Sequence, residues 1–379
     1  MIKKKRGSPL YQQVRDIIKK KIETGEYKPQ TQIPSIVELT SFFSVSTITI
    51  RQALADLMRN GYLETKAGGG TFVTADWAEK QQKKSNKIIG VIFTDFFKNP
   101  FFSQILEGIE SVMSIHGYHV IVNNNDNNSE KEARLIREIK EKGVDGFILC
   151  PASSNRSSIS NQILKELFEE KFPLVFVDRK IEEFPFDYVT TNNFEGGYIA
   201  TKYLLGLGHT KIGFILGIDA NTVRERLQGY QKALKEAGID FDPLMIKKSY
   251  IELTYKEAGY QNTMELLHLK NPPTAIFACN DPLAMGSYKA CQELGLNIPE
   301  DLSIIGYDDI PEFSHLNPPI TTIHQPIKEM GEQAAKLLLE RIEDRNKLAK
   351  KVILKNTLIV RNSCRQYSLQ TDKKIKVPV

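Results

Sequence analysis

Polar side chains with forked hydrogen-bonding groups recur just after buried, strand-like runs of this chain. Amide, carboxylate and guanidinium groups can bind the neighbouring hydroxyls of a sugar, while aromatic rings cover its apolar faces. The forked candidates are Asn99, Asp178, Arg179, Arg226, Asn280, Asp308 and Gln325, and the aromatic candidates are Phe101, Phe102 and Tyr307. Each of them alone is equally well explained as a loop cap, a turn residue or a surface ion pair. Because open α/β sheets bind ligands at the carboxyl ends of their strands, we expect the group to line one small-molecule site.

A second candidate site lies in the first quarter of the chain, at the start of a predicted helix. Ser46 can cap this helix, and its buried stripe leaves the first turn exposed. Exposed residues at such a position can hydrogen-bond bases or phosphates in the major groove of DNA. The candidates for DNA contact are Ser35, Ser46, Thr47, Ile48, Thr49, Arg51, Gln52, Lys66, Gly69 and Gly70. Ile48 would be an exposed β-branched residue that fits the methyl group of thymine.

The charge of the chain is uneven. Residues 1–87 hold 16 Lys and Arg against 8 Asp and Glu, a net charge of +8, whereas the whole chain of 379 residues carries +5. The remaining residues therefore carry −3, so the basic excess favours a polyanion as the partner of the first quarter. A solvated basic surface without a partner explains the charge equally well. The order of the predicted helices and strands has to decide between these two explanations.

Three short helices are predicted near the N-terminus. Apolar residues at helical spacing place the first over 10–22, with Ile17 on its buried face. Ser35 and Glu38 have the spacing of a capping box and begin the second, and Ser46 begins the third.

A hairpin follows the third helix. Two strand-like runs, 62–65 and 71–74, surround a tip at 66–70 whose glycines let the backbone approach a groove or a phosphate. A nucleotide phosphate loop is disfavoured, because no strand, glycine loop and helix with Gly-Lys-Ser/Thr occurs. The order of elements is that of an α+β winged helix-turn-helix domain, which favours double-stranded DNA as the partner.

The polar stretch 75–87 lacks apolar periodicity and is predicted to be a linker after a first domain over 1–74. Beyond it, strand and helix patterns alternate, pause near residue 180 and resume near residue 196. Repeated βα units build parallel sheets, so residues 88–364 are predicted to form an α/β domain with two doubly wound lobes. Residues 365–379 are assigned to a C-terminal tail.

No apolar run approaches the ~20 residues that a membrane span needs. The basic N-terminus is followed by an amphipathic pattern instead of an apolar signal core. We therefore expect a cytoplasmic protein that does not contact membranes. The four cysteines lie far apart without a C-x-x-C pair, and we interpret them as structural residues.

The sequence contains no set of residues with catalytic or metal-binding spacing. His116 and His119 lack a third ligand nearby, and common hydrolase and zinc motifs are absent. His209 follows a glycine after a predicted helix, which is typical of a helix end. Asp308 and Asp309 are adjacent, and adjacent residues of a strand project in opposite directions, so they do not form an acid–base pair. We expect neither enzymatic activity, nor a cofactor, nor a metal.

Residues 9–74 resemble the DNA-binding domain of GntR-type bacterial regulators. The matching pieces are Pro9-Leu10-Tyr11-Gln12-Gln13-Val14, Ile33-Pro34-Ser35, Val45-Ser46 with Thr49 to Leu54, and Gly69-Gly70-Thr71-Phe72-Val73. Two positions depart from the family pattern, because Val37 and Thr47 stand where the family commonly has Arg. The resemblance implies an operator-binding domain with fewer guanidinium contacts than is usual.

Residues 87–364 resemble the LacI/GalR-type regulators and the periplasmic sugar-binding proteins of type I that share their fold. The matching pieces are Asn99-Pro100-Phe101-Phe102, Val177-Asp178-Arg179, Asn192 to Gly197 with Gly208-His209, Arg226 to Gly229, Asn280-Asp281, Gly306 to Asp309, and Thr321 to Gln325. The resemblance implies that the forked and aromatic candidates face a cleft between two lobes. The combination is similar to that of the arabinose-repressor type of regulator.

These observations predict a homodimeric, DNA-binding transcription regulator, with repression favoured over activation. Its effector, bound between the lobes, is expected to be a sugar, because Asn99, Asp178, Arg179 and Asp308 favour a polyol over a purine or a phosphate. Two alternatives stay open: a sugar-binding transport protein without DNA function, and a sugar-processing enzyme.

Overall fold

The computed structural model describes residues 9–66, 69–75, 77, 86–97, 99–153, 158–248 and 253–368. Most of the predicted linker, Gly68 of the hairpin tip and the end of the predicted tail lie outside these residues. The chain divides into two compact units, residues 1–86 and residues 87–379.

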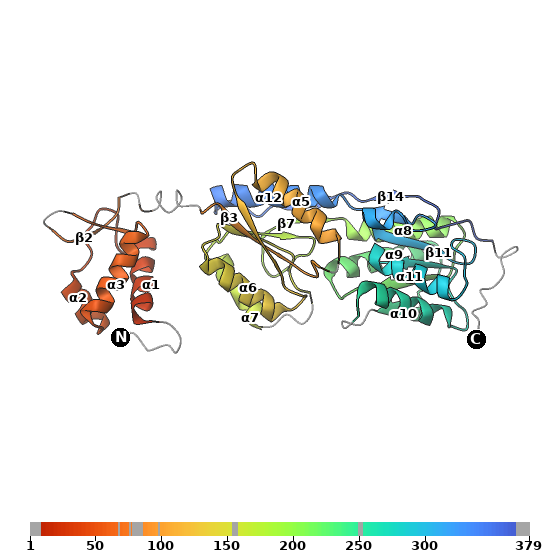
Figure 1. Cartoon of the computed structure of the whole chain (residues 1–379), viewed down its shortest axis with the longest axis horizontal. Coiled ribbons are helices and arrows are strands. Elements are labelled where there is room, and N and C mark those ends of the chain that lie inside the picture. Colours follow the sequence, from red (N-terminus) through yellow and green to blue (C-terminus); the bar gives the residue numbers. More distant parts are fainter. Residues whose placement is uncertain are drawn as a thin grey trace. The chain divides into compact units, whose positions relative to one another are not determined.

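The first unit contains three helices and a two-stranded hairpin (Figure 1). Its elements are α1 (Leu10–Glu23), α2 (Ile36–Phe43), α3 (Thr47–Arg59), β1 (Leu63–Thr65) and β2 (Thr71–Val73). The strands pair antiparallel, and Gln32 forms an isolated bridge with Phe72 beside them. The predicted winged helix-turn-helix is confirmed.

The caps and the core of this unit follow from its sequence pattern. Ser35 closes a capping box with Glu38, and the hydroxyl of Ser46 accepts the backbone N–H of Thr49 at the start of α3. One face of each helix packs into a common core, which contains Val14, Ile18, Ile22, Leu39, Phe43, Ile50, Ala53, Leu54 and Leu57. The prediction that Ile17 is buried was wrong: its side chain is 37% exposed, since residues 14, 18 and 22 alone complete the stripe.

The second unit has two lobes, each built on a six-stranded sheet. The N-lobe sheet has the order β13-β7-β6-β5-β3-β4, and all its pairs are parallel. Its strands are β3 (Ile88–Phe93), β4 (His119–Asn124), β5 (Gly146–Leu149), β6 (Leu174–Val177), β7 (Asp187–Thr191) and β13 (Lys351–Leu354). Its helices are α5 (Phe101–Met113), α6 (Ser129–Glu141), α7 (Ser158–Glu169) and α12 (Ile327–Glu343). Figure 1 shows α5 and α12 on one face of the sheet and α6 and α7 on the other.

The C-lobe sheet has the order β14-β12-β11-β10-β8-β9, with β14 antiparallel to β12 and the other pairs parallel. Its strands are β8 (Ile212–Leu216), β9 (Ile246–Lys248), β10 (Ala275–Ala278), β11 (Ser303–Asp308), β12 (Thr321–His324) and β14 (Thr357–Ile359). Its helices are α8 (Asn193–Gly206), α9 (Asn221–Glu236), α10 (Tyr255–Leu267) and α11 (Asp281–Glu293). The predicted α/β fold with two doubly wound lobes is confirmed.

The chain crosses between the lobes three times. The crossings follow β7 into α8, β12 into α12 and β13 into β14. Polar contacts connect them: the N–H of Asn192 donates to the carbonyl of Leu354 across 3.0 Å, and Asn356 Nδ2 donates to the carbonyl of Asn192 across 2.8 Å. The carboxyl ends of the parallel strands in both sheets face these crossings, so strand-end side chains of the two lobes can line one space.

Packing continues past the predicted end of this domain. The N–H of Tyr367 donates to the carbonyl of Leu207, and the Tyr367 ring stacks on His209 at 5.4 Å. Arg365 donates to the carbonyls of Pro299 and Glu300. Residues 365–367 are therefore part of the C-lobe. None of the helices in the described part of the chain is long and apolar enough to cross a membrane.

Candidate functional site

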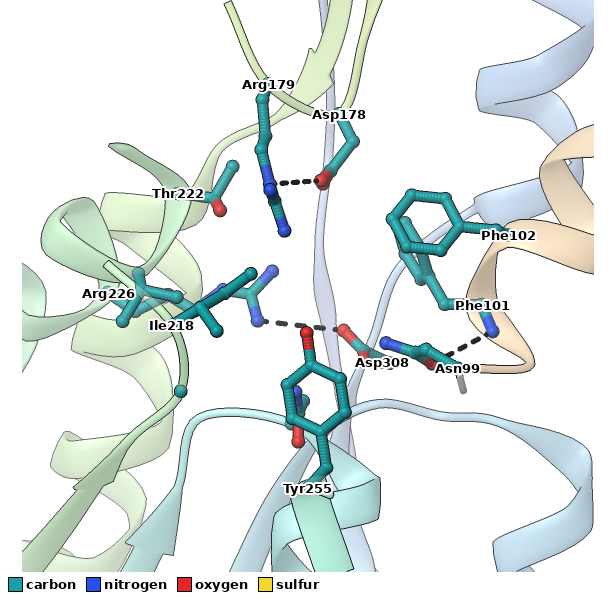
Figure 2. A pocket seen from close by; sticks show the side chains of 13 residues that line it. Asn99, Phe101, Phe102, Asp178, Arg179, Ile218, Thr222, Arg226, Tyr255 and Asp308 are labelled. Carbon is teal, nitrogen blue, oxygen red and sulfur yellow. Dashed lines mark hydrogen bonds and ion pairs between the residues drawn. The ribbon is translucent and has the colours of Figure 1, made fainter. Parts of the chain in front are cut away.

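Eight of the nine predicted effector residues line one cavity between the lobes (Figure 2). The N-lobe contributes Asn99, Phe101, Phe102, Asp178 and Arg179, and the C-lobe contributes Gly217, Ile218, Thr222, Val223, Arg226, Tyr255, Asn280 and Asp308. In Figure 2, Asp178 and Arg179 point into the space from one side, and Tyr255 enters it from the opposite side. The cavity thus combines two carboxylates, two guanidinium groups, two amides and three aromatic rings.

Two aspartates at strand ends have left-handed backbones. Asp178 directly follows β6 with φ +64°, and Asp308 ends β11 with φ +114°. Such conformations cost non-glycine residues free energy and persist where the surroundings hold them. Burial raises the pKa of both carboxyls, and the guanidinium of Arg226 opposes this effect at each. Buried carboxyls at these positions can bind hydroxyl groups of a ligand.

Arg226 of α9 is the most extensively bonded group of the cavity. Its Nε donates to Asn193 Oδ1 across 2.9 Å, and one terminal nitrogen donates to the carbonyl of Cys279 across 2.5 Å. The same nitrogen lies 3.7 Å from an oxygen of Asp308, and the guanidinium stacks on the ring of Tyr307 at 3.6 Å. These contacts fix the planar group, and it lines the cavity as a preorganised donor.

Arg179 has fewer short hydrogen bonds than Arg226. One terminal nitrogen donates to Asn127 Oδ1 across 3.3 Å, and Nε lies 3.6 Å from Asp178 Oδ2. Within the described part of the chain, Nε is buried without a hydrogen bond. A buried N–H without a hydrogen bond is costly, and the neighbouring Asp178 carboxyl offsets part of this cost.

The aromatic wall begins at the N-terminus of α5. Asn99 Oδ1 accepts the N–H of Phe101 across 3.1 Å, and the rings of Phe101 and Phe102 pack edge to face at 5.3 Å. Sequence reasoning missed the opposite aromatic residue, Tyr255, as well as Thr222 at the start of α9. A capping box of Thr254 and Glu257 marks the helix that begins at Tyr255, and this motif is visible in the sequence.

Two candidates from the sequence do not line the cavity. Gln325, predicted to bind the effector, is buried behind it: it accepts the hydroxyl of Thr191 across 2.5 Å and donates to Asp308 Oδ1 across 2.7 Å. It lies where two crossings meet, so it positions Asp308 instead of contacting the cavity. Tyr307 lies under Arg226 and is fully buried.

The remaining sequence interpretations concern structural residues. Gly208, with φ +89°, and His209 complete a hydrogen-bonded helix end by donating to Leu205 and Leu204, so His209 is part of a helix terminus as predicted. Its ring also bonds Thr274 and the carbonyl of Arg365. Three of the cysteines are buried and Cys364 is half-buried, and burial raises the pKa of all four thiols.

The DNA-contact candidates lie on α2, α3 and the hairpin. Thr47, Ile48, Arg51 and Gln52 are exposed on the first turns of α3, with Ile48 77% exposed. The other helical candidates are Ser35, Ser46 and Thr49, which the structure engages in capping bonds. On the hairpin, the exposed Lys66 lies over the ring of Phe72, and Gly69 and Gly70 are exposed.

Comparisons with known proteins agree with this architecture. A family described as "Bacterial regulatory proteins, gntR family" matches residues 10–73, and one described as "Periplasmic binding protein-like domain" matches residues 201–364. The ribose operon repressor of Haemophilus influenzae is 36% identical over 295 residues, which are 77% of this chain and 85% of that protein. A LacI family transcriptional regulator from Enterococcus faecium, solved with bound ribose, is 36% identical, covers 74% of this chain and 100% of its own, and has a TM-score of 0.65. The chain belongs to the LacI family of transcriptional regulators.

Other members of the LacI family are similar over the same region. The transcriptional repressor PurR of Aliivibrio salmonicida is 36% identical over 265 residues, 69% of this chain and 77% of that protein. The predicted function, a DNA-binding transcription repressor controlled by a small-molecule effector, is confirmed. This LacI family member carries a GntR-type DNA-binding domain, and its relatives are repressors, which disfavours the transport alternative.

Proposed function

We propose that the cleft of this repressor binds a neutral pentose of the ribose type. The observation that carries the proposal is the lining of the cavity, which holds two carboxyl groups and two guanidinium groups beside three aromatic rings. A sugar hydroxyl can accept from Arg179 through its oxygen and donate its own hydrogen to Asp178 or Asp308. The two aspartates lie beside the two guanidinium groups, so the cavity does not present the excess of basic groups that a phosphate would need.

The aromatic rings and the relatives support a compact ligand. Phe101, Phe102 and Tyr255 can cover the apolar faces of a sugar ring. Ribose is the bound molecule in the Enterococcus faecium structure, which is similar over the whole two-lobed domain. A purine base is the second candidate, because the same rings can stack on it.

The test is thermal unfolding of the full-length protein with D-ribose, other pentoses, hexoses, cellobiose and purine bases. A ligand at 100 times its dissociation constant stabilises by ~2.7 kcal/mol, which corresponds to several degrees in Tm. We expect D-ribose or another pentose to raise Tm. If only purines raise Tm, the effector is a purine and the sugar proposal is wrong. If only hexoses or disaccharides raise Tm, the effector is not a pentose of the ribose type.

We further propose that the repressor acts in the cytoplasm as a homodimer on a two-fold symmetric operator. One winged helix per subunit would read one half-site, with Thr47, Ile48, Arg51 and Gln52 in the major groove and Lys66 at a phosphate. A homodimer with two-fold symmetry presents two equivalent DNA-binding domains, which match two equivalent half-sites of a symmetric operator. Sedimentation of the protein alone and with operator DNA measures the number of protein chains in each complex. Two chains per duplex are expected, and one chain per duplex would contradict the proposal.

A further inference from the structure

One hydrogen bond joins the two lobes through a residue that lines the cavity. The hydroxyl of Tyr255 donates to Oδ2 of Asp95 across 3.2 Å. Tyr255 is the first residue of α10 in the C-lobe, and its ring forms part of the cavity wall. Asp95 follows β3 in the N-lobe. A single side chain therefore contacts both the cavity and the opposite lobe.

Asp95 is held by the loop that carries the N-lobe side of the cavity. Its backbone is left-handed, with φ +51°, and its carbonyl accepts the N–H of Asn99 across 3.1 Å. The next N–H, of Phe96, donates to Asn124 Oδ1 across 3.2 Å. Because Asn99 lines the cavity and is bonded to Asp95, a ligand that orders Asn99 also orders the acceptor of the bond between the lobes.

The backbone before Tyr255 is fixed by hydrogen bonds at the start of α10 in the C-lobe. Thr254 and Glu257 form a capping box, in which Glu257 Oε2 accepts both the N–H and the hydroxyl of Thr254. Burial and the negative charge of Asp95 raise the pKa of Tyr255 well above 10, so its hydroxyl remains a donor at physiological pH. At 3.2 Å the bond is longer than the roughly 2.5–3.0 Å usual for an O–H···O pair, so a small separation of the lobes is enough to break it.

We propose that Tyr255 and Asp95 form a latch that holds the lobes together over the cavity and thereby sets the affinity for the effector. The inference rests on the proposed function of the cleft. The two residues belong to different lobes, so separating the lobes breaks their bond. Asp95 is a positioning residue, since Tyr255 alone of the pair lines the cavity. A ligand that favours the closed arrangement gains affinity from every contact that is made only there.

The latch is tested first without a ligand, by electron-spin distance measurements on the full-length protein. Labels are attached to Arg134→Cys on α6 and Lys232→Cys on α9, whose side chains are 66% and 53% exposed. We expect Tyr255→Phe, Asp95→Ala and the double variant to lengthen the distance between the lobes by the same amount. Asp95→Asn should retain the wild-type distance, because its amide oxygen still accepts the hydroxyl.

Tyr260→Phe is the matched control. It removes a hydroxyl of the same helix that bonds Glu293 across 2.8 Å, within the C-lobe. The distance in this variant should equal that of the wild type. The latch is refuted if Tyr255→Phe leaves the distance unchanged, or if the effects of Tyr255→Phe and Asp95→Ala add in the double variant.

Calorimetric titration with D-ribose then measures the consequence for binding. We expect Tyr255→Phe and Asp95→Ala each to bind about tenfold more weakly than the wild type, and the double variant to bind no more weakly than either. Wild-type protein that binds neither ribose nor another sugar would reject the proposed function, while the distances still decide the latch. Wild-type ribose affinity in Tyr255→Phe would reject the latch and leave the proposed function intact.

Discussion

Asp308 and Asp309 are adjacent at the end of β11, yet their carboxyl groups bind different partners. Asp308 lies 3.7 Å from Arg226 and accepts from Gln325 across 2.7 Å, at the cavity. Asp309 accepts from Arg361 across 2.7 Å and contacts His324 at 3.0 Å. The prediction that the two point in different directions and form no acid–base pair agrees with these contacts, and the pair offers a matched test of the cleft.

Asp308→Asn should weaken effector binding by at least about tenfold, because one of the two carboxyl oxygens at the cavity is replaced by an amide nitrogen that cannot accept a hydrogen bond. Asp309→Asn should leave effector affinity unchanged and cost about 1 kcal/mol of stability or less, since its ion pairs are partly exposed. Calorimetric titration and thermal unfolding of both variants measure these effects. Equal loss of effector affinity in the two variants would mean that Asp308 has no special role in binding.

Arg51→Ala should lower operator affinity by about 10- to 100-fold, the usual cost of losing a base or phosphate contact by Arg. Fluorescence anisotropy with an operator selected from random duplexes measures it over a range of salt concentrations. If Arg51 contacts a phosphate, the slope of log K against log salt also decreases by ~0.9. Arg59→Ala, at the far end of α3, is the control and should bind as the wild type does. Unchanged operator affinity in Arg51→Ala would place Arg51 outside the interface.

Gly197→Ala should destabilise the C-lobe by about 1–3 kcal/mol, because the added methyl group meets the backbone of Arg226 where α8 and α9 touch. Gly206→Ala lies on the same helix with open space around it, and should stabilise by about 0.5–1 kcal/mol through helix propensity. The same substitution, glycine to alanine, is therefore expected to lower Tm at residue 197 and to raise it at residue 206. A rise in Tm for Gly197→Ala would show that the two helices can separate without loss.

Asp281 predicts a pH dependence of stability. It accepts from the Thr322 hydroxyl and from the N–H of Ile310, and burial raises its pKa to about 7, whereas the unfolded value is about 3.9. Between about pH 4 and pH 7 the native state binds the additional proton, so stability falls as pH rises through this window.

Urea unfolding of wild type and Asp281→Asn at pH 4 to 8 isolates this contribution. The difference in unfolding free energy, wild type minus variant, should fall by at most about 1.4 kcal/mol per pH unit inside the window and level off above pH 7. A difference that stays constant with pH would contradict the assignment to Asp281.

Local signals in the sequence predicted more of this molecule than non-local ones. Ser35 and Ser46 carry their capping information within four residues, and strand-end polar residues identified the cleft because parallel sheets expose those ends together. Strand β13 was not predicted from the sequence. It pairs with β7, which lies more than 150 residues earlier in the chain, and its residues alternate only between exposed and half-buried. The position of Gln325 behind the cavity also depends on where two distant crossings meet, which no local pattern encodes.

The three crossings also affect the order in which the chain can fold during synthesis. The DNA-binding domain is a contiguous segment that can fold as soon as its last strand, β2, has left the ribosome. The N-lobe cannot be completed until α12 and β13 are made, since both pack into a sheet whose other strands end at residue 191. A chain interrupted anywhere between about residues 90 and 350 therefore carries an intact DNA-binding domain and an incomplete effector domain. Only a chain that has been synthesised through β13 can complete the N-lobe and so bind an effector that regulates its DNA-binding domain.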